Sequence, residues 1–249
     1  MNALILAAGL GTRLGEYTKD RPKALVQVAG KPMLEHHIEN LARFGFDHII
    51  VNVHHFGDQI IDFLAQNGNF GLDITVSDER GQLLDTGGGI RKALHMLPSQ
   101  PLLVHNVDIF SDTDLKALYQ EHLGTGACAT LSTAQRETSR YLCFNDAGRL
   151  CGWLNRSTGQ TRSPNSGFNP SDYTPYAFQG IHVISPSILP MLDSVSAPSF
   201  SITDFYVSSS ADLDIRRSTG TASMWADAGK PHTLQTAAGI IQELSGRKD

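Results

Sequence analysis

Short apolar runs alternate with longer amphipathic stretches through the first half of the chain. The runs predict strands buried on both faces of a parallel sheet, where polar alternation is not needed. The amphipathic stretches predict helices, as in 32–45, where Leu34, Ile38 and Leu41 share one face and Pro32 fits the first turn. We expect strands at 2–8, 48–53, 73–77 and 101–107, and helices at 32–45, 58–66 and 88–97. This order predicts an α/β fold with a doubly wound, mostly parallel mixed sheet flanked by helices.

The pattern is less regular after residue 110. Ser111 and Asp112 are expected to cap a helix that runs to about 122. The segment 155–175 is rich in Ser, Thr, Asn, Gly and Pro, and we expect a mobile loop that forms either a lid over a site or a surface excursion. The other expected elements are strands at 127–133, 140–154, 176–184 and 213–224, and helices at 186–193, 203–210 and 230–245, the last begun by Pro231.

A glycine-rich loop with two cations follows the first predicted strand. Gly9 and Gly11 come directly after the apolar run, and Arg13 and Lys23 follow. Glycines permit positive φ and allow backbone N–H groups to approach a ligand closely. The planar guanidinium and the compact ammonium both suit phosphate oxygens. The loop therefore predicts a site for a polyphosphate.

Two better-known glycine motifs do not fit this loop. A dinucleotide fingerprint needs a third glycine where Leu14 stands. A Walker A loop needs Ser or Thr after its lysine, whereas Pro32 follows Gly30 and Lys31. A nicotinamide-dependent dehydrogenase is accordingly disfavoured.

Asp108 follows the apolar run 102–104 and is expected at the carboxyl end of a strand. Open α/β sheets bind ligands at that edge, and the glycine-rich loop also leaves a strand there. Mg²⁺ prefers a small number of carboxylates together with substrate phosphates. Asp108 is therefore expected to face the same crevice as the polyphosphate.

Six ordered motifs, which span nearly the whole chain, resemble those of the sugar-1-phosphate nucleotidyltransferases. They are "LAAGLGTRL" with "RPKALVQVAGKPML", Thr86–Gly89, Asn106–Asp108, Gly180-Ile181, Ile202–Asp204 and Trp225–Gly229. Enzymes of this family join a nucleoside triphosphate to a sugar 1-phosphate and release pyrophosphate. The resemblance implies this activity and a single GT-A or Rossmann-like nucleotidyltransferase domain over 1–249, with a nucleotide-binding half at 1–130 and a sugar-phosphate half at 131–249.

The resemblance also implies roles for particular residues. Arg13 and Lys23 would be catalytic, and Asp108 and Asp227 would hold Mg²⁺. The implied nucleotide-binding residues are Ala7, Ala8, Gly9, Gly11, Thr12, Asp85, Gly87 and Gly88. The implied sugar-binding residues are Asn106, Gly152, Gly180 and Asp204.

The "DTGGGI" segment and the short length look most like the uridylyltransferases that act on N-acetylmuramate 1-phosphate in cell-wall recycling. UTP and that sugar phosphate are therefore the expected substrates. Mannose- or heptose-1-phosphate guanylyltransferases and cytidylyltransferases share most of these motifs and stay open. A non-catalytic regulatory subunit that binds nucleotide sugars is an alternative from another class.

Composition excludes several further classes. A net charge of -5 argues against a nucleic-acid partner. The absence of a signal peptide pattern and of a span-length apolar stretch argues for the cytoplasm, without a membrane partner. Cys128, Cys143 and Cys151 lack metal spacing, and His54-His55 lack a third ligand, so we expect free thiols and structural histidines. The sequence lacks the G-x-S-x-G motif of a nucleophile elbow, so nothing indicates a hydrolase of that kind. A monomer or a small homo-oligomer is expected.

Overall fold

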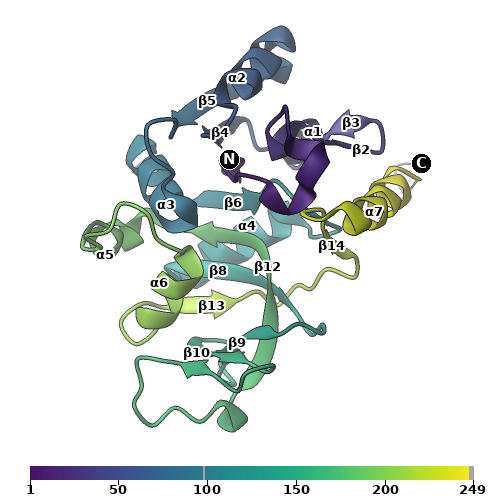
Figure 1. Ribbon diagram of the computed structural model, residues 1–249. Helices are drawn as coiled ribbons and strands as arrows, with labels where there is room; N and C mark the ends of the chain where they lie inside the picture. The colour runs from purple at the N-terminus through teal and green to yellow at the C-terminus, as the bar shows by residue number, and fades with distance from the viewer. Residues whose placement is uncertain (98, 247–249) are drawn as a thin grey trace.

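The computed structural model describes residues 1–97 and 99–246, and in this part of the chain ten strands form one twisted sheet (Figure 1). Its main strand order is β11-β10-β9-β12-β6-β1-β4-β5. The four strands at one end are parallel; they are β1 (Asn2–Leu6), β4 (His48–Val53), β5 (Asp73–Asp78) and β6 (Leu102–Asn106). Because they run in parallel, their carboxyl ends meet at one edge.

The remaining strands extend this sheet in mixed directions. The long strand β12 (Thr174–Ile184) pairs antiparallel with β6, β8 and β9, and so joins the two halves of the chain. The others are β8 (Ala129–Ala134), β9 (Arg140–Phe144), β10 (Leu150–Asn155), β11 (Thr161–Arg162) and β13 (Ile215–Arg217). The expected doubly wound, mostly parallel mixed sheet is confirmed.

Helices cover both faces of the sheet because successive strand residues point to opposite sides. Ala3 and Ile5 lie in one apolar core, whereas Leu4 lies in the other. The first core includes side chains of α1 (Met33–Arg43), α2 (Gly57–Gln66), α4 (Leu115–Thr125) and α7 (Leu234–Gly246). The second includes side chains of α3 (Asp85–Met96), α5 (Leu189–Asp193) and α6 (Ile202–Ser208).

Two small sheets and several 3₁₀ turns lie outside the main sheet. Strand β7 (Ile109–Ser111) pairs with β14 (Trp225–Asp227), and β2 (Gln27–Val28) pairs with β3 (Lys31–Pro32). The 3₁₀ segments are η1 (Thr12–Thr18), η2 (Lys23–Leu25), η3 (Gly68–Gly71), η4 (Pro170–Asp172), η5 (Pro186–Ile188) and η6 (Pro231–Thr233). The β7–β14 pair holds a late segment of the chain against the end of β6.

Several helix starts differ from the sequence-based expectation. Helix α3 begins at Asp85 rather than 88, so Gly87 and Gly88 belong to its first turn. Helix α4 begins at Leu115 because Asp114, not Ser111 or Asp112, supplies the cap: its carboxylate accepts the Ala117 N–H at 2.8 Å. Pro32 precedes α1 at the N-cap instead of lying in its first turn.

The expected strand at 213–224 is largely wrong. Only Ile215–Arg217 of that range forms a strand, and the following Ser, Thr and Gly residues offer few apolar side chains to bury. The range 140–154 forms a hairpin whose turn contains Gly148 at φ +73°. Within 155–175, Arg162 pairs with Trp153 through β11, while the mobility of this segment stays a prediction.

Among the described residues, no helix combines the length and the apolar character that a membrane crossing requires. The three cysteines are free, as expected.

Three buried histidines lie in or beside the sheet. Burial lowers the pKa of His105 and of His122 to about 4, and that of His182 to about 3. His122 hydrogen-bonds Thr130 and Ser185 through its two ring nitrogens. Neither ring nitrogen of His182 has a partner within the described residues, and its neighbours include the rings of Phe178 and Tyr206. These imidazoles are therefore neutral in the folded protein at pH 7.

We predict that acid destabilises the protein through these histidines. The unfolded chain protonates each imidazole below about pH 6.5, whereas the folded chain does not until about pH 3 or 4, so stability is full above pH 6.5 and falls below it. For His182 the loss is about 2 kcal/mol between pH 6.5 and 5. Urea unfolding across this range should show a shallower pH dependence for His182→Leu than for the wild type. The exposed control His232→Gln should retain the wild-type slope, and an equal slope for all three proteins would contradict the assignment.

Candidate active site

The loop after β1 depends on the small size of Gly11. Gly11 has φ +68°, and a Cβ there would lie 2.9 Å from Thr18 Cγ2 and 3.1 Å from Lys23 Cβ. The Thr18 hydroxyl also donates to the Gly11 carbonyl at 3.0 Å, which fixes the turn. Gly9 differs from the expectation, because its φ is not positive and a Cβ would meet no protein atom within 4 Å. The protein itself therefore has room for a side chain at position 9.

Four charged side chains from distant parts of the chain meet beside this loop. The Lys23 ammonium donates to Asp108 Oδ2. The Arg13 guanidinium lies 3.6 Å from Asp108 Oδ2 and 3.4 Å from Asp227 Oδ2, so it bridges both carboxylates. We call Arg13, Lys23, Asp108 and Asp227 the ionic centre. The structure brings together all four residues for which the family resemblance implies catalytic or metal-binding roles.

Strand pairing explains how Asp227 reaches Asp108. Asp108 lies between β6 and β7, and Asp227 ends β14, whose partner on β7 is Ile109. The Ala228 N–H donates to the Asp108 carbonyl at 2.7 Å. Gly229 donates its N–H to Asp227 Oδ1 at 2.7 Å, and a Cβ there would lie 2.5 Å from Arg13 Nη2 and 2.6 Å from Asp227 Oδ1, so a side chain at this position would displace the Arg13–Asp227 pair. Backbone contacts therefore fix both carboxylates.

Burial gives the two carboxylates different proton affinities. Burial raises the pKa of Asp108, and the nearby Asp227 carboxylate adds to this effect, while Lys23 opposes it. Burial also acts upwards on Asp227, but the Gly229 N–H, Asp108, Arg13 and Lys23 together lower its pKa below the usual value. The Lys23 and Asp108 side chains are only 12% and 11% exposed, so their attraction is weakly screened by solvent.

A cavity of about 240 Å³ opens next to the ionic centre, at the carboxyl ends of β1, β4, β5 and β6. The predicted site residues that line it are Ala8, Gly9, Lys23, Asp85, Asn106 and Asp108. Asn52, Glu79, Leu83 and Thr86 line it as well. Sequence reasoning therefore identified most of this cavity, while Asn52 and Glu79 were missed.

Asn52 and Glu79 form a buried polar network under the loop. Asn52 Oδ1 accepts the N–H groups of Ala7 at 2.6 Å and Ala8 at 3.2 Å. Its Nδ2 donates to Glu79 Oε1 at 2.8 Å, and Glu79 Oε2 accepts the Leu84 N–H at 3.3 Å. The amides of Ala7 and Ala8 are consequently satisfied within the protein. A polar residue inside the apolar run 49–53, and an acid directly after a predicted strand, were the available signals.

Gly87 and Gly88 contact protein instead of lining this cavity. A Cβ on Gly87 would overlap the Phe200 ring, and one on Gly88 would overlap the Pro198 carbonyl. The Gly87 N–H donates to the Phe200 carbonyl at 2.8 Å. Asp85, at φ +56°, is the residue of this segment that borders the cavity, together with Thr86. Thr12 begins η1 and does not line the cavity.

The four predicted sugar-binding residues lie in three separate places, since Asn106 and Gly180 are neighbours. Gly180, at φ +75°, packs against Asn106, where a Cβ would lie 2.9 Å from the Asn106 amide nitrogen. Gly152 lies under the Phe168 ring, where a Cβ would lie 2.6 Å from the ring carbons, and it does not border a described cavity. Asp204 pairs with Arg162 at 2.6 Å and borders a further cavity of about 670 Å³.

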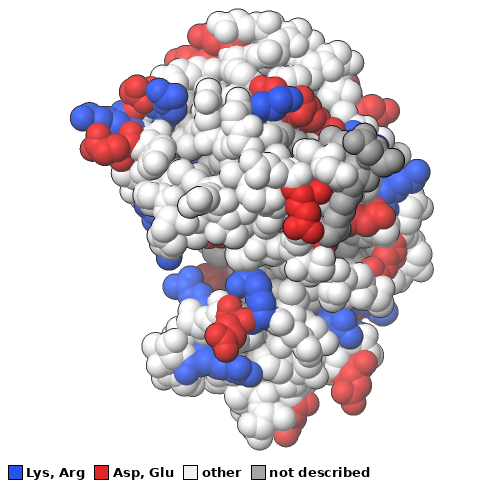
Figure 2. Space-filling model, turned by 90° about the vertical axis from the view of Figure 1, so that its right-hand side faces the viewer, with Lys and Arg blue, Asp and Glu red and all other residues white. Residues whose placement is uncertain are grey.

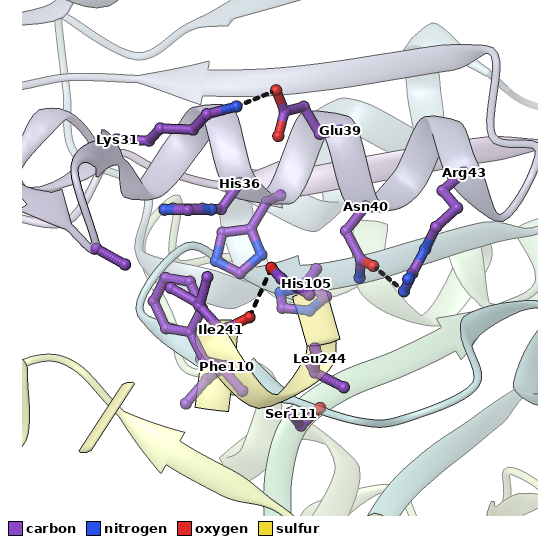
Figure 3. A pocket seen from close by; sticks show the side chains of 14 residues that line it. Lys31, His36, Glu39, Asn40, Arg43, His105, Phe110, Ser111, Ile241 and Leu244 are labelled. Atoms are coloured by element: carbon purple, nitrogen blue, oxygen red, sulfur yellow. Dashed lines mark hydrogen bonds and ion pairs between the residues drawn. The ribbon is translucent and has the colours of Figure 1, made fainter. Parts of the chain in front are cut away.

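Another cavity, of about 540 Å³, lies between α1, β7 and α7 (Figure 3). His36, His37 and His105 line it, and Ile241 and Leu244 of α7 face them. It contains none of the predicted site residues, but the His37 ring bonds the Val107 carbonyl at 2.8 Å, directly before Asp108. Burial, with His105 nearby, holds the pKa of His37 well below its usual value, so it is neutral and supports the backbone there.

The carboxylates of the ionic centre suit Mg²⁺ only in combination with a substrate. Within the described residues, no three or more His, Cys, Asp or Glu side chains are grouped to hold a metal. Mg²⁺ nevertheless commonly takes one or two carboxylates and completes its shell with water and phosphate oxygens. Asp108 and Asp227 provide that donor set. His54 Nδ1 hydrogen-bonds the Glu79 carbonyl at 2.7 Å.

Comparisons with known proteins assign the family. A model of the MobA-like NTP transferase domain matches residues 3–166. The N-acetylmuramate alpha-1-phosphate uridylyltransferase of Caulobacter vibrioides is 32% identical, over 97% of this chain and 97% of that protein. The chain belongs to the sugar-1-phosphate nucleotidyltransferases. A uridylyltransferase with the same name from Neisseria meningitidis is 42% identical to this nucleotidyltransferase, over 48% of the present chain and 52% of its own length.

Solved structures support the fold. HddC from Yersinia pseudotuberculosis, complexed with GMP-PN, has a TM-score of 0.75 at 21% identity and covers 96% of this nucleotidyltransferase and 99% of its own chain. A putative glucose-1-phosphate thymidylyltransferase from Bacillus anthracis has a TM-score of 0.80 at 18% identity, with coverage of 98% and 96%. At these identities the likeness concerns the fold alone.

We predict that Asn52 is essential for stability. Asn52→Leu removes the acceptor of two N–H groups and the partner of Glu79, all of them buried, and should cost about 3 kcal/mol of unfolding free energy. Urea denaturation measures the loss. Gln59→Ala, which removes one hydrogen bond to the Asp20 carbonyl at the surface, is the control and should change stability by less than about 0.5 kcal/mol. Equal midpoints for the wild type and Asn52→Leu would refute the role of this network.

Proposed function

We propose that this enzyme transfers the uridylyl group of UTP to N-acetylmuramate 1-phosphate, forming the UDP-sugar and pyrophosphate. The Caulobacter relative carries the proposal, because the similarity extends over 97% of both chains and therefore includes the sugar-phosphate half. The ionic centre supplies the chemistry that such a transfer needs. Product formation would return a cell-wall sugar to its nucleotide-activated form.

The reaction joins two anions, so charge neutralisation is its main requirement. A phosphate oxygen of the sugar 1-phosphate attacks the α-phosphorus of UTP, the bond to the β-phosphate oxygen breaks, and pyrophosphate leaves with that electron pair. Lys23, which is almost buried, would hold the α-phosphate and the incoming phosphate. Arg13, which is 53% exposed, can reach the triphosphate tail and the leaving pyrophosphate. Positioning and electrostatics then account for catalysis without a covalent intermediate.

Asp108 and Asp227 would hold Mg²⁺ together with the triphosphate. The ion would supply further positive charge at the phosphates and help to orient them. Within the protein itself, Lys23 and Arg13 neutralise the two carboxylates, which explains why the same four side chains can lie so close together.

A guanylyltransferase is the second candidate, supported by specific relatives. The mannose-1-phosphate guanyltransferase of Yarrowia lipolytica is 29% identical over 78% of this chain, but this match covers only 52% of the fungal protein. The match to the Caulobacter uridylyltransferase covers 97% of both chains, and it therefore favours UTP.

A pyrophosphate-release assay tests the proposed function. The protein is incubated with Mg²⁺, each of UTP, GTP, CTP and dTTP, and each of N-acetylmuramate, mannose and glucose 1-phosphate. We expect the highest kcat/KM with UTP and N-acetylmuramate 1-phosphate. A preference for GTP with mannose 1-phosphate would support the guanylyltransferase, and no release with any pair would favour a non-catalytic binding subunit.

We predict that Lys23→Ala lowers kcat by about 10³-fold, because one preorganised cation is lost where negative charge accumulates. Steady-state pyrophosphate release measures the effect, and circular dichroism checks the fold. Lys19→Ala is the matched control, since Lys19 is exposed in the same region and its ion pair with Glu16 lies at the surface. Unchanged turnover of Lys23→Ala would exclude the catalytic role.

Gly9 gives a second test of the nucleotide position. Because a Cβ on Gly9 meets no protein atom within 4 Å, Gly9→Ala should unfold like the wild type. A nucleotide seated against the loop would meet the added methyl, so we expect UTP affinity to fall by about tenfold or more in calorimetric titration. Gly124→Ala adds a methyl at an equally open position on α4 and should leave UTP affinity unchanged. Full UTP affinity in Gly9→Ala would place the nucleotide elsewhere.

A further inference from the structure

The cavity of about 670 Å³ beside β9 and β10 is lined by an excess of positive charge. Three arginines, Arg136, Arg140 and Arg162, border it, and Asp204 is the one carboxylate among its lining residues. On the face that Figure 2 shows, Lys and Arg side chains, with Asp and Glu side chains among them, lie on the part of the molecule below a hollow. We call this space the arginine cavity. An anion would balance its charge.

Two of these guanidiniums lie over tryptophan rings. Arg136 lies 3.8 Å from the centre of the Trp225 ring and donates to the Phe178 carbonyl at 3.3 Å. Arg162 lies 4.0 Å from the centre of the Trp153 ring and donates to Asp204 at 2.6 Å. The ring contact and the hydrogen bond together restrict each guanidinium and thereby the directions of its N–H groups. The cavity wall is therefore preorganised instead of being a set of mobile surface cations.

The donors of the arginine cavity are incompletely used by the protein. Nε of Arg136 and Nε of Arg162 are buried without a hydrogen-bond partner in the described part of the chain. Arg140 is exposed at the start of β9, and no carboxylate among the described residues forms an ion pair with it. Buried unpaired donors are uncommon in folded proteins and are costly. Since these two Nε atoms are covered by protein, the exposed guanidinium of Arg140 is the donor group of this cavity that a ligand can reach directly.

This cavity is structurally connected to the ionic centre. Arg136 lies over the ring of Trp225. Trp225 is the first residue of β14, and Asp227 is the last residue of the same strand. The Trp225 indole donates to the Gln179 carbonyl at 3.0 Å, and the next residue, Gly180, packs against Asn106. Arg136 is also close enough to Asp227 for their charges to interact. A sugar whose phosphate lies at Lys23 would accordingly extend towards the arginine cavity.

We propose that the arginine cavity binds a carboxylate carried by the sugar ring, so that the acceptor is an acidic sugar 1-phosphate. This inference rests on the proposed function and adds a residue-level basis for its sugar specificity. Lys23 and Arg13 would neutralise the 1-phosphate and the nucleotide, and Asp204 already pairs with Arg162, which leaves Arg136 and Arg140 for a second anion. Their planar donor forks match a carboxylate. Tyr141, Leu142 and Phe178 provide apolar surface for the group that carries it.

The arrangement predicts strong selection against the neutral analogue. A site built around hydrogen-bond donors rejects a substrate that lacks the matching group, because the donors then remain unpaired. N-acetylmuramate 1-phosphate and N-acetylglucosamine 1-phosphate differ only by a lactyl ether that bears a carboxylate, and so they isolate this contact. We expect kcat/KM to be at least about 100-fold higher for the acidic sugar.

The test compares both sugars with the wild type, Arg140→Gln and Arg156→Gln. Arg140→Gln should lower kcat/KM for the acidic sugar by about 10- to 100-fold, mainly through KM, and should reduce the ratio between the two sugars. Arg156 directly follows β10, and its guanidinium carbon lies 4.5 Å from the centre of the Tyr141 ring, but Arg156 does not line the cavity. Arg156→Gln should therefore retain the wild-type ratio.

The outcomes separate this inference from the proposed function. Turnover of both sugars with equal kcat/KM, or an unchanged ratio in Arg140→Gln, would overturn the carboxylate site while leaving uridylyl transfer intact. If no sugar supports pyrophosphate release, the proposed function fails, and calorimetric binding of the same two sugar phosphates decides the inference. Tighter binding of the acidic sugar, weakened in Arg140→Gln, supports the site; equal binding rejects it.

Discussion

The neutralisation of a nearly buried carboxylate is the constraint on which the rest of the site depends. Asp108 lies at the end of a central strand, where water can screen it only weakly. Lys23 and Arg13 compensate its charge, and they come from the segment that follows the first strand. Their positions depend on the tight turn at Gly11 and on the space that Gly229 leaves for the Arg13 guanidinium. The glycine pattern and the charge pattern are thus parts of one arrangement.

The sheet explains how segments so distant in sequence form this arrangement. Parallel strands β1, β4, β5 and β6 end at one edge, which collects the loops that follow them. The antiparallel strand β12 then attaches the second half of the chain directly to β6. Asn52 and Glu79 connect neighbouring strand ends through hydrogen bonds and hold the loop from below. These hydrogen bonds fix the backbone that leads into the glycine-rich loop beside the ionic centre.

Sequence reasoning was most successful where the pattern is local or where a motif is long. Buried strands such as 48–53 were predicted from their apolar runs, and the convergence of Arg13, Lys23, Asp108 and Asp227 was predicted from the family motifs. Asn52 was missed because the hydrogen bonds that give it meaning join residues 45 positions apart. Gly87 was instead assigned a role that the structure does not show. It has no side chain because the Phe200 ring fills that space, and no spacing rule in the sequence identifies Phe200 as its partner.

Strand β14 is short, yet it delivers the second carboxylate, and α7 packs against it. The three residues of β14 pair with β7 in a small sheet that is separate from the main one. The spacing of the two carboxylates therefore depends on this short pairing, and a change that loosens it would separate Asp227 from Asp108 without disturbing the central strands.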